Sequence, residues 1–252
     1  MKKPLVRIII GIVVLVTAAL VSSLFLLGRI VKKGVETVGP RAARVEVKLD
    51  SADVWLGRAE LKGLSIGNPP GYKARVAIKV GDISVRLNTM SALSGKVIID
   101  SITVKSPEIT IEGGLKKNNL TQIQKNLNDY VAGHADSSQT GTKPAASPSA
   151  AGKPDRKFQI NELVITGARL RIASLFETGA GVTISLPDIH VANLGPDQAG
   201  ITSPEVAQKV LTALLSSIAT NAADTFGKLG KDAVKRFDFK KAGEKLKSLL
   251  DK

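Results

Sequence analysis

The sequence predicts an α+β protein in which a membrane-spanning helix precedes an antiparallel sheet of bent, bulged strands and amphipathic helices follow it. Three observations predict this. A charge-free segment, IIIGIVVLVTAALVSSLFLL, occupies residues 8–27, and a slipped alternation of apolar residues recurs downstream. From Ser203 the apolar spacing becomes helical. Bent strands with one apolar face are expected to form a groove- or half-barrel-like sheet.

The charge-free segment has the length of a membrane anchor. About twenty apolar residues cross the hydrocarbon core of a bilayer. A cleaved signal peptide is the alternative, but its apolar region usually has only about 7–15 residues and ends at a small-residue cleavage site. Here the run continues into LGRIVKK without a convincing site. We therefore expect an uncleaved transmembrane helix over residues 8–28. Basic residues flank it equally, so charge alone does not orient it.

The slipped alternation separates four apolar residues by two, three and two positions. Its five copies span residues 59–66, 78–85, 97–104, 158–165 and 184–191. The first three begin 19 residues apart, which indicates an internal structural repeat. A strand keeps one apolar face across such a slip if it carries a β-bulge, an extra residue that bends the strand. We therefore expect bent strands, with Gly63 and Gly81 inside two of the bulges.

A second interpretation of each copy is two short strands joined by a tight turn, or a strand beside a helix, since two residues suffice for a hairpin loop. The inserted pairs lack the Asn-Gly or Asp-Gly order that such a turn prefers, which favours the bent strand. Pro187 indicates that the last copy is irregular or lies at a sheet edge.

A longer unit is also repeated, a bent strand followed by a short strand. Its apolar positions recur at a constant offset of 61 as Ile99/Ile160, Ile102/Leu163, Val104/Ile165, Ile109/Leu170 and Ile111/Ile172. We expect the two stretches to be structural equivalents in one sheet. A row of about eight to ten strands would be roughly 40–50 Å wide at about 4.8 Å per strand.

The remaining segments differ in composition. Residues 132–157 are rich in Ala, Ser, Pro, Gly and Thr, which is typical of a flexible linker. A helix is expected from Ser203 as its N-cap, with Pro204 in the first helical position and one apolar side. Residues 226–252 indicate a second, weaker basic amphipathic helix. These helices are expected either to cover the sheet or to lie on a membrane.

Composition and charge exclude several functional classes. The net charge of +14 favours anionic partners such as phospholipid headgroups or nucleic acid. Nucleic acid is excluded because aromatic residues make up 4% of the chain and none is interleaved with a basic run. Without cysteine there is no disulfide, thiolate metal site or cysteine nucleophile. His134 and His190 lack metal-ligand spacing and neighbouring nucleophile motifs, so we expect no catalytic residue, metal, cofactor or enzyme activity.

Residues 61–120 carry an ordered series of motifs. These are an IGNPPG turn, an A-x-x-V-x-x-I-x-V strand, an SALSGKVII step, an I-x-V-x-x-P-x-I strand pair and an Asn-Leu after Gly-Gly. In this order the motifs resemble the N-terminal region of AsmA-like envelope proteins, closely over this segment and weakly back to the anchor. The resemblance implies a single-pass bacterial inner-membrane anchor, a periplasmic C-terminal domain, and kinship with repeating β-groove proteins associated with phospholipid movement and outer-membrane assembly.

Together these observations divide the chain into domains, and the resemblance orients the anchor. They are a cytoplasmic N-terminus (1–7), the transmembrane anchor (8–28), an AsmA-like β region (29–131), a flexible linker (132–157), a continuation of the sheet (158–195) and an amphipathic helical region (196–252). AsmA-like proteins proposed as lipid bridges have many hundreds of residues. This shorter chain would bridge an envelope only with stacked copies or a partner.

The implied function is lipid transport or outer-membrane homeostasis, with a phospholipid membrane and envelope proteins as partners. The apolar strand face would contact acyl chains through Ile78, Val80, Ile83, Val85, Ile99, Ile102 and Val104. Alternating apolar residues more commonly form an ordinary core, here beneath the C-terminal helix or against a second sheet. A closed core would instead indicate a membrane-tethered β-domain that acts as a protein-interaction scaffold or stress-protective module.

Overall fold

The computed structural model describes residues 26–91, 94–114, 117–135, 157–173, 182–196 and 199–229. The expected anchor lies outside these residues except for its last three positions. Most of the expected linker, and the expected second C-terminal helix beyond Leu229, also lie outside them. Within the described ranges, no helix combines the length and the apolar character needed to cross a membrane.

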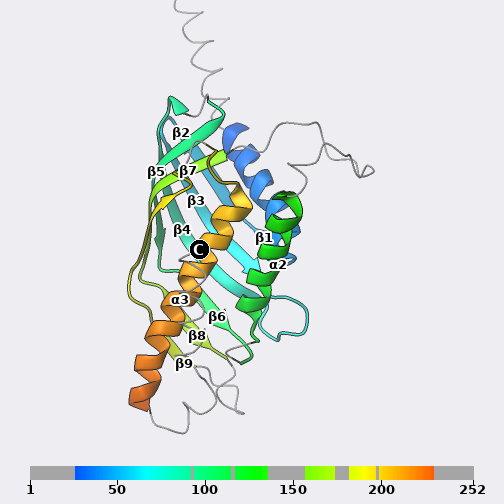
Figure 1. Ribbon diagram of the computed structural model, residues 1–252, viewed down its shortest axis with the longest axis vertical. Helices are drawn as coiled ribbons and strands as arrows, with labels where there is room; N and C mark the ends of the chain where they lie inside the picture. Colours follow the sequence, from blue (N-terminus) through cyan, green and yellow to red (C-terminus); the bar gives the residue numbers. More distant parts are fainter. Residues whose placement is uncertain are drawn as a thin grey trace, which may run out of the picture.

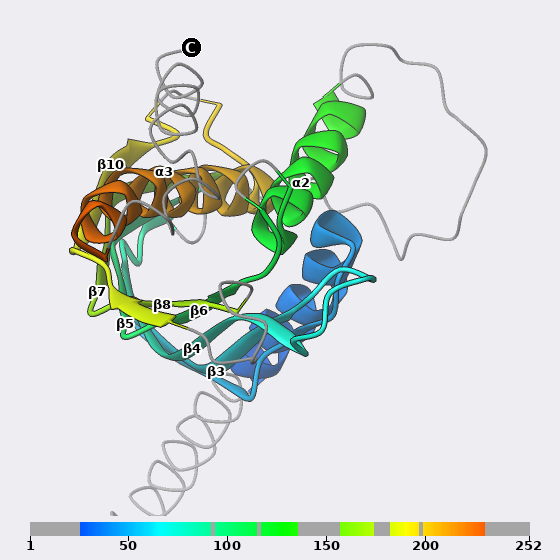
Figure 2. The same ribbon diagram turned by 90° about the horizontal axis from the view of Figure 1, so that it is seen from below.

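The described chain forms one curled sheet with helices on its concave side (Figure 1). In chain order the elements are a helix over residues 26–43, β1 (Val47–Lys48), β2 (Ser51–Trp55), β3 (Arg58–Gly67), β4 (Val76–Leu87), β5 (Lys96–Lys105), β6 (Glu108–Ile111), α2 (Asn119–Ala135), β7 (Lys157–Thr166), β8 (Arg169–Ile172), β9 (Val182–Ser185), β10 (Ile189–Leu194) and α3 (Ser203–Leu229). Seen end-on, the sheet forms an arc, and the helix over residues 26–43, α2 and α3 lie across its opening (Figure 2). The α+β class and the half-barrel shape are confirmed.

The sheet is mixed, so the antiparallel prediction is wrong in this respect. β5 pairs with β7 in parallel, and β6 pairs with β8 in parallel. Ile102 lies opposite Leu163, and Ile109 lies opposite Leu170, which is the offset of 61 seen in the sequence. The predicted equivalence is therefore confirmed. The two copies lie side by side with their strands parallel. Parallel strands need a crossover connection, and here that connection contains α2.

The slip that interrupts the alternation in β5 is a one-residue bulge. Arg86 of β4 pairs with Ser101 and Leu87 pairs with Ile99, which leaves Asp100 without a partner in β4. β5 itself continues through the slip without a break. The bent-strand prediction is confirmed here, and the extra residue restores the apolar face after the bend.

The other copies accommodate the slip in different ways. β3, β4 and β7 also run through it without a break. Gly63 and Gly81 lie opposite each other in β3 and β4, and the register is the same on both sides of them, so the prediction of bulges at these two glycines is wrong. The register between β3 and β4 shifts later, between Ile66 and Gly67. The fifth copy splits around Pro187 into β9 and β10, each of which has a single neighbouring strand. This agrees with the predicted irregularity, because proline cannot donate to a strand ladder.

The ten strands do not lie in one row. β3 pairs with β2 and then β1 along one edge, and β4 pairs with β5 and β6 in the same way. Each therefore belongs to two half-sheets, ordered β2-β3-β4-β5-β7-β10 and β1-β3-β4-β6-β8-β9. Six neighbouring strands span about 24 Å at about 4.8 Å per interval. The sheet is therefore about half as wide as ten strands in one row would be.

Each helix buries an apolar side against the concave face of the sheet. Their fully buried residues are Ala42 and Ala43 of the first helix, Leu120, Ile123 and Leu127 of α2, and Leu211, Leu214, Leu215 and Ile218 of α3. These side chains join one core with residues of the sheet. α3 therefore covers the sheet, one of the two arrangements expected from its sequence. Helix α2 was not expected, because residues 29–131 were assigned to a β region.

The N-terminus of α3 is capped by Thr202, one residue before the predicted Ser203. The Thr202 amide and hydroxyl donate to the Glu205 carboxylate at 2.6 and 2.7 Å, a reciprocal capping box. Burial by itself raises the pKa of Glu205. The hydrogen bonds from Thr202, together with the nearby charges of Lys157 and Lys209, outweigh burial and hold that pKa below its ordinary value of 4.5.

Candidate functional site

The predicted lipid-contact residues share the concave face of the sheet. Ile83 lies opposite Val104, and Val85 lies opposite Ile102, across β4 and β5. Directly opposed residues project from the same face of a sheet. Ile102 in turn lies opposite Leu163, which belongs to the core formed with the helices. The face that carries these residues is therefore the one that the helices partly cover.

Burial divides the predicted residues into two groups. Ile78 and Val80 lie in the core, with 7% and 4% of their surface exposed. The other five are only half-buried, and we call them the apolar strip: Ile83, Val85, Ile99, Ile102 and Val104. An ordinary core therefore occupies one end of the predicted surface, whereas the strip retains contact with solvent.

The repeat provides an internal comparison for the strip. Three of its residues on β5 pair in register with three residues on β7, in the pairs Ile99–Ile160, Ile102–Leu163 and Val104–Ile165. The β7 members are 1%, 2% and 1% exposed, whereas their β5 partners are half-buried. Equivalent positions thus differ in what covers them. α3 packs along β10, beside β7, and leaves β4 and β5 farther from its cover (Figure 2).

Charged residues accompany the strip on the opposite face, as expected. Lys79, Arg86 and Lys105 alternate with the apolar residues and are exposed. Arg86 donates from Nε to the Ser101 hydroxyl at 3.3 Å. Lys96 is partly buried and donates to the Gln159 side chain at 2.9 Å. The convex face of the middle strands is therefore polar where the concave face is apolar.

A buried polar network fixes α2 over the other half of the sheet. Asn119 is fully buried, and its amide group donates to Asn68 Oδ1 and to the Thr110 carbonyl, both at 2.7 Å. Asn119 Oδ1 accepts from the Glu112 amide at 3.0 Å. The Glu112 carboxylate accepts from the backbone amides of Lys73 and Ala74 in the turn after β3. The IGNPPG turn and the Asn-Leu motif, far apart in sequence, thus form one structural unit.

The sequence contained a signal for α2 that its assignment to a β region passed over. Asn118 caps the helix, since its Oδ1 accepts from the Thr121 amide at 2.8 Å. Apolar residues then follow at helical spacing, at Leu120, Ile123 and Leu127. The burial of Asn119 has no such signal, because its partners come from two other segments, the turn after β3 and the end of β6.

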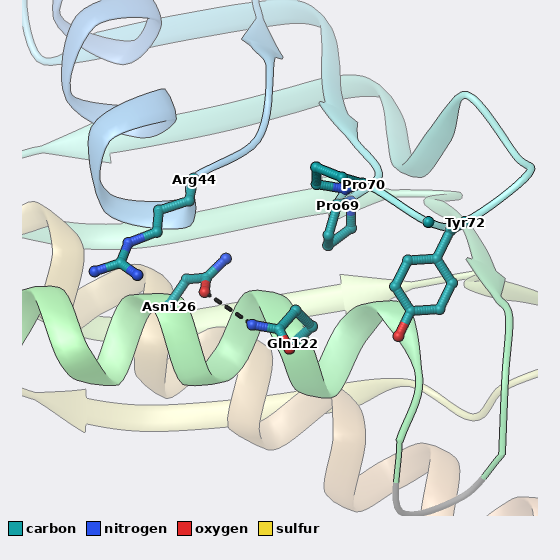
Figure 3. A pocket seen from close by; sticks show the side chains of 7 residues that line it. Arg44, Pro69, Pro70, Tyr72, Gln122 and Asn126 are labelled. Carbon is teal, nitrogen blue, oxygen red and sulfur yellow. Dashed lines mark hydrogen bonds between the residues drawn. The ribbon is translucent and has the colours of Figure 1, made fainter.

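A cavity of about 700 Å³ lies beside this network, between the IGNPPG turn and α2 (Figure 3). Its lining residues are Arg44, Pro69, Pro70, Gly71, Tyr72, Gln122 and Asn126. Two of them are held in place, since Gln122 donates to Asn126 at 3.1 Å and Asn126 donates to the Ala43 carbonyl at 2.8 Å. None of the lining residues belongs to the apolar strip.

The two histidines lie apart from these features. His134 stacks on Tyr130 near the end of α2, with ring centroids 4.0 Å apart. His190 is exposed on β10. Within the described part of the chain, no three His, Cys, Asp or Glu side chains are grouped as metal ligands would be. The absence of enzyme activity stays a prediction.

Comparison with known proteins gives one positive result. A model of the AsmA family matches residues 1–221. A search of curated proteins returned no match. The family match extends well beyond the motifs in residues 61–120 and includes the whole sheet and most of α3. The protein therefore belongs to the AsmA family.

Proposed function

We propose that this AsmA-family protein is anchored in the bacterial inner membrane by residues 8–28 and binds phospholipid acyl chains on the apolar strip of its periplasmic domain. Through this binding it contributes to lipid transport or outer-membrane homeostasis. No enzyme activity, metal or cofactor is part of the proposal. Its partners are the phospholipid membrane and, for movement across the envelope, other envelope proteins.

The unequal cover of the repeated strands is the observation that supports lipid binding. Ile102 and Leu163 occupy equivalent positions and face the same side of the sheet, yet only Leu163 is fully buried. An apolar surface that continues a core without being covered by it is typical of a ligand-binding groove. An acyl chain lying along the strip would cover it as the core covers the equivalent residues of β7.

Elementary energetics favour such an occupant. Removing one methylene group from water contributes about 0.8 kcal/mol. An acyl chain that covers even part of three neighbouring strands would bury several methylene groups, so a short groove suffices to hold it. The polar convex face remains in water, and the lipid headgroup would remain at the open side of the strip.

The dimensions of the sheet limit the proposed role. A half-sheet about 24 Å wide is short relative to an envelope. Transport across the periplasm would therefore require stacked copies or a longer partner. A single copy is suited to holding or presenting lipid close to the membrane in which it is anchored.

The experiment compares variants of the full-length protein by native mass spectrometry and lipid extraction after detergent solubilisation. Ile83→Asp and Ile102→Asp place a carboxylate in the strip, where part of it stays in contact with water. We expect both variants to fold and to retain less phospholipid than the wild type. Lipid bound around the anchor is common to all variants, so the difference between them reports on the strip.

Two matched variants make the result specific. Leu163→Asp buries an unpaired carboxylate at the equivalent covered position, and we expect it to unfold. Thr103→Asp, on the opposite face of β5, should leave both the fold and the lipid unchanged. If Ile102→Asp unfolds as Leu163→Asp does, the strip is an ordinary core and the tethered scaffold becomes the better function. Unchanged lipid in a folded Ile102→Asp protein would also contradict lipid binding on the strip.

A further inference from the structure

Large apolar side chains are exposed at one end of the curled sheet. Leu56, at the turn between β2 and β3, is 83% exposed, and Met90, in the loop between β4 and β5, is 80% exposed. Trp55 and three residues at the start of the first helix are exposed as well. We call this set the apolar rim: Leu26, Leu27, Ile30, Trp55, Leu56 and Met90.

The turn and the loop of the rim lie side by side. Arg58 pairs with Arg86 at the ends of β3 and β4, so both connections emerge at the same end of the sheet. The Leu87 amide donates to the Gly57 carbonyl at 3.1 Å. Within the loop, the Met90 amide donates to the Asn88 side chain at 3.1 Å. Hydrogen bonds therefore hold Leu56 and Met90 at neighbouring positions.

The first helix reaches the same end because it runs antiparallel to β1 and β2. Glu36 accepts a hydrogen bond from the Leu49 amide at 3.2 Å, and Lys32 donates to the Asp50 carbonyl at 3.0 Å. One turn earlier, Gly28 packs so closely on the Ala52 carbonyl that any side chain there would collide with it. As the helix is followed back towards its first residue, it contacts residues progressively farther along β1 and β2. Leu26 and Leu27, at its start, therefore lie near Trp55, at the end of β2.

Positively charged residues lie close to the apolar rim. Arg29, Arg58 and Arg86 are exposed, and none of the ion pairs among the described residues involves them. Arg58 follows the Leu56-Gly57 turn directly and lies opposite Arg86 of β4. An interfacial segment inserts about 5–10 Å into the boundary between headgroups and acyl chains, so basic residues just behind its apolar end lie near the lipid phosphates. An anionic membrane surface attracts such cations.

We infer that the apolar rim inserts into the bilayer that holds the anchor, with Leu56 and Met90 among the acyl chains and the three arginines at the lipid phosphates. The charge-free sequence of residues 8–27 ends at Leu27, so the chain enters the described domain at this rim. Trp55 would take the interfacial position that tryptophan prefers. The sheet would then stand with one end embedded in the membrane.

This inference rests on the proposed anchor but does not require lipid on the strip. In β4, Leu87 lies two residues beyond Val85 and pairs with Ile99, so the strip extends towards the rim. If both proposals hold, an acyl chain could pass from the leaflet to the strip without crossing water. The two proposals are tested by different measurements.

The single tryptophan of the chain makes the test direct. Full-length protein is reconstituted in vesicles of phosphatidylethanolamine and phosphatidylglycerol, with or without bromine atoms near the headgroup end of the acyl chains. We expect bromine to quench Trp55 fluorescence at least twofold and aqueous iodide to quench it weakly. Trp55 projects from the convex face with Arg58, so lipid on the concave strip is shielded from it.

Variants assign the effect to the rim. Leu56→Ser combined with Met90→Ser should restore iodide quenching and reduce bromine quenching. Val38→Ser changes an exposed apolar residue farther along the helix and should have no effect. Strong iodide quenching of the wild type without bromine quenching would overturn the inference, as would a double variant indistinguishable from the wild type. Ile102→Asp should retain bromine quenching even if it loses co-purified lipid.

Discussion

Gly63 and Gly81 lie opposite each other across β3 and β4, but only Gly63 has a positive φ, of 66°. A side chain on Gly63 would collide with the carboxylate group of Asp50, whereas a side chain on Gly81 would meet open space. The backbone of β3 therefore requires glycine at position 63, whereas β4 does not require it at position 81.

We predict that Gly63→Ala destabilises the protein by about 1–3 kcal/mol, because alanine is strained in the left-handed region and displaces Asp50. Gly81→Ala should change stability by less than about 1 kcal/mol in either direction. Urea denaturation followed by far-ultraviolet circular dichroism measures both. Equal losses in the two variants would contradict this difference between the two positions.

Shortening equivalent side chains in the two copies of the repeat should show that one is more deeply buried than the other. Leu163→Ala should lower stability by about 2–5 kcal/mol, since it opens a cavity in a closed core. Ile102→Ala should lower it by less than half as much, because its side chain is already partly in water. The urea midpoints of the two variants give the comparison. A loss for Ile102→Ala as large as that for Leu163→Ala would mean that the strip is packed as tightly as the core.

Stability in acid should depend on Glu205. Its folded-state pKa lies below the unfolded value of 4.5, so the unfolded chain binds the proton more tightly. The stabilisation is therefore fully present above pH 4.5 and is lost as the pH falls through the folded-state pKa. Glu205→Gln should flatten this part of the pH profile of the melting temperature. The exposed Glu108→Gln is the control, and an unchanged profile in Glu205→Gln would contradict the assignment.

The buried network should be sensitive at Asn119. Asn119→Ala removes the partners of the Glu112 amide, Asn68 Oδ1 and the Thr110 carbonyl. Each buried group left unsatisfied costs about 1–3 kcal/mol, so we expect a loss of at least about 3 kcal/mol. Gln122→Ala, on the exposed side of α2, should change stability by less than about 0.5 kcal/mol. Hydrogen exchange of the Lys73 and Ala74 amides should accelerate only in Asn119→Ala.

The repeating apolar pattern predicted the bent strands because it is local. A slip such as that at Asp100 changes the face of every later residue, so it can be read from neighbouring residues alone. The offset of 61 also predicted which residues are equivalent. It did not predict that their strands are parallel. The offset identifies which residues are equivalent, but it does not say whether the chain crosses back over the sheet between the two copies.

The burial of individual residues on the concave face could not be predicted in the same way. Ile102 and Leu163 have the same spacing and similar side chains, yet only Leu163 is fully buried. The network around Asn119 likewise joins three segments that sequence order keeps apart. Periodicity identifies an apolar face, but the burial of each residue on it depends on which helix crosses above.

The parallel pairing of β5 with β7 also has a consequence for folding. β3, β4 and β5 are consecutive in the chain, whereas the paired residues of β5 and β7 are separated by 61 positions. Closing such a loop costs roughly 3–4 kcal/mol of chain entropy before any contact compensates it. We therefore expect the β3–β5 meander to form first and β7, β10 and α3 to dock later. The newly made chain would then expose the concave face of β3–β5 before α3 docks, when a nearby membrane is the most available apolar surface.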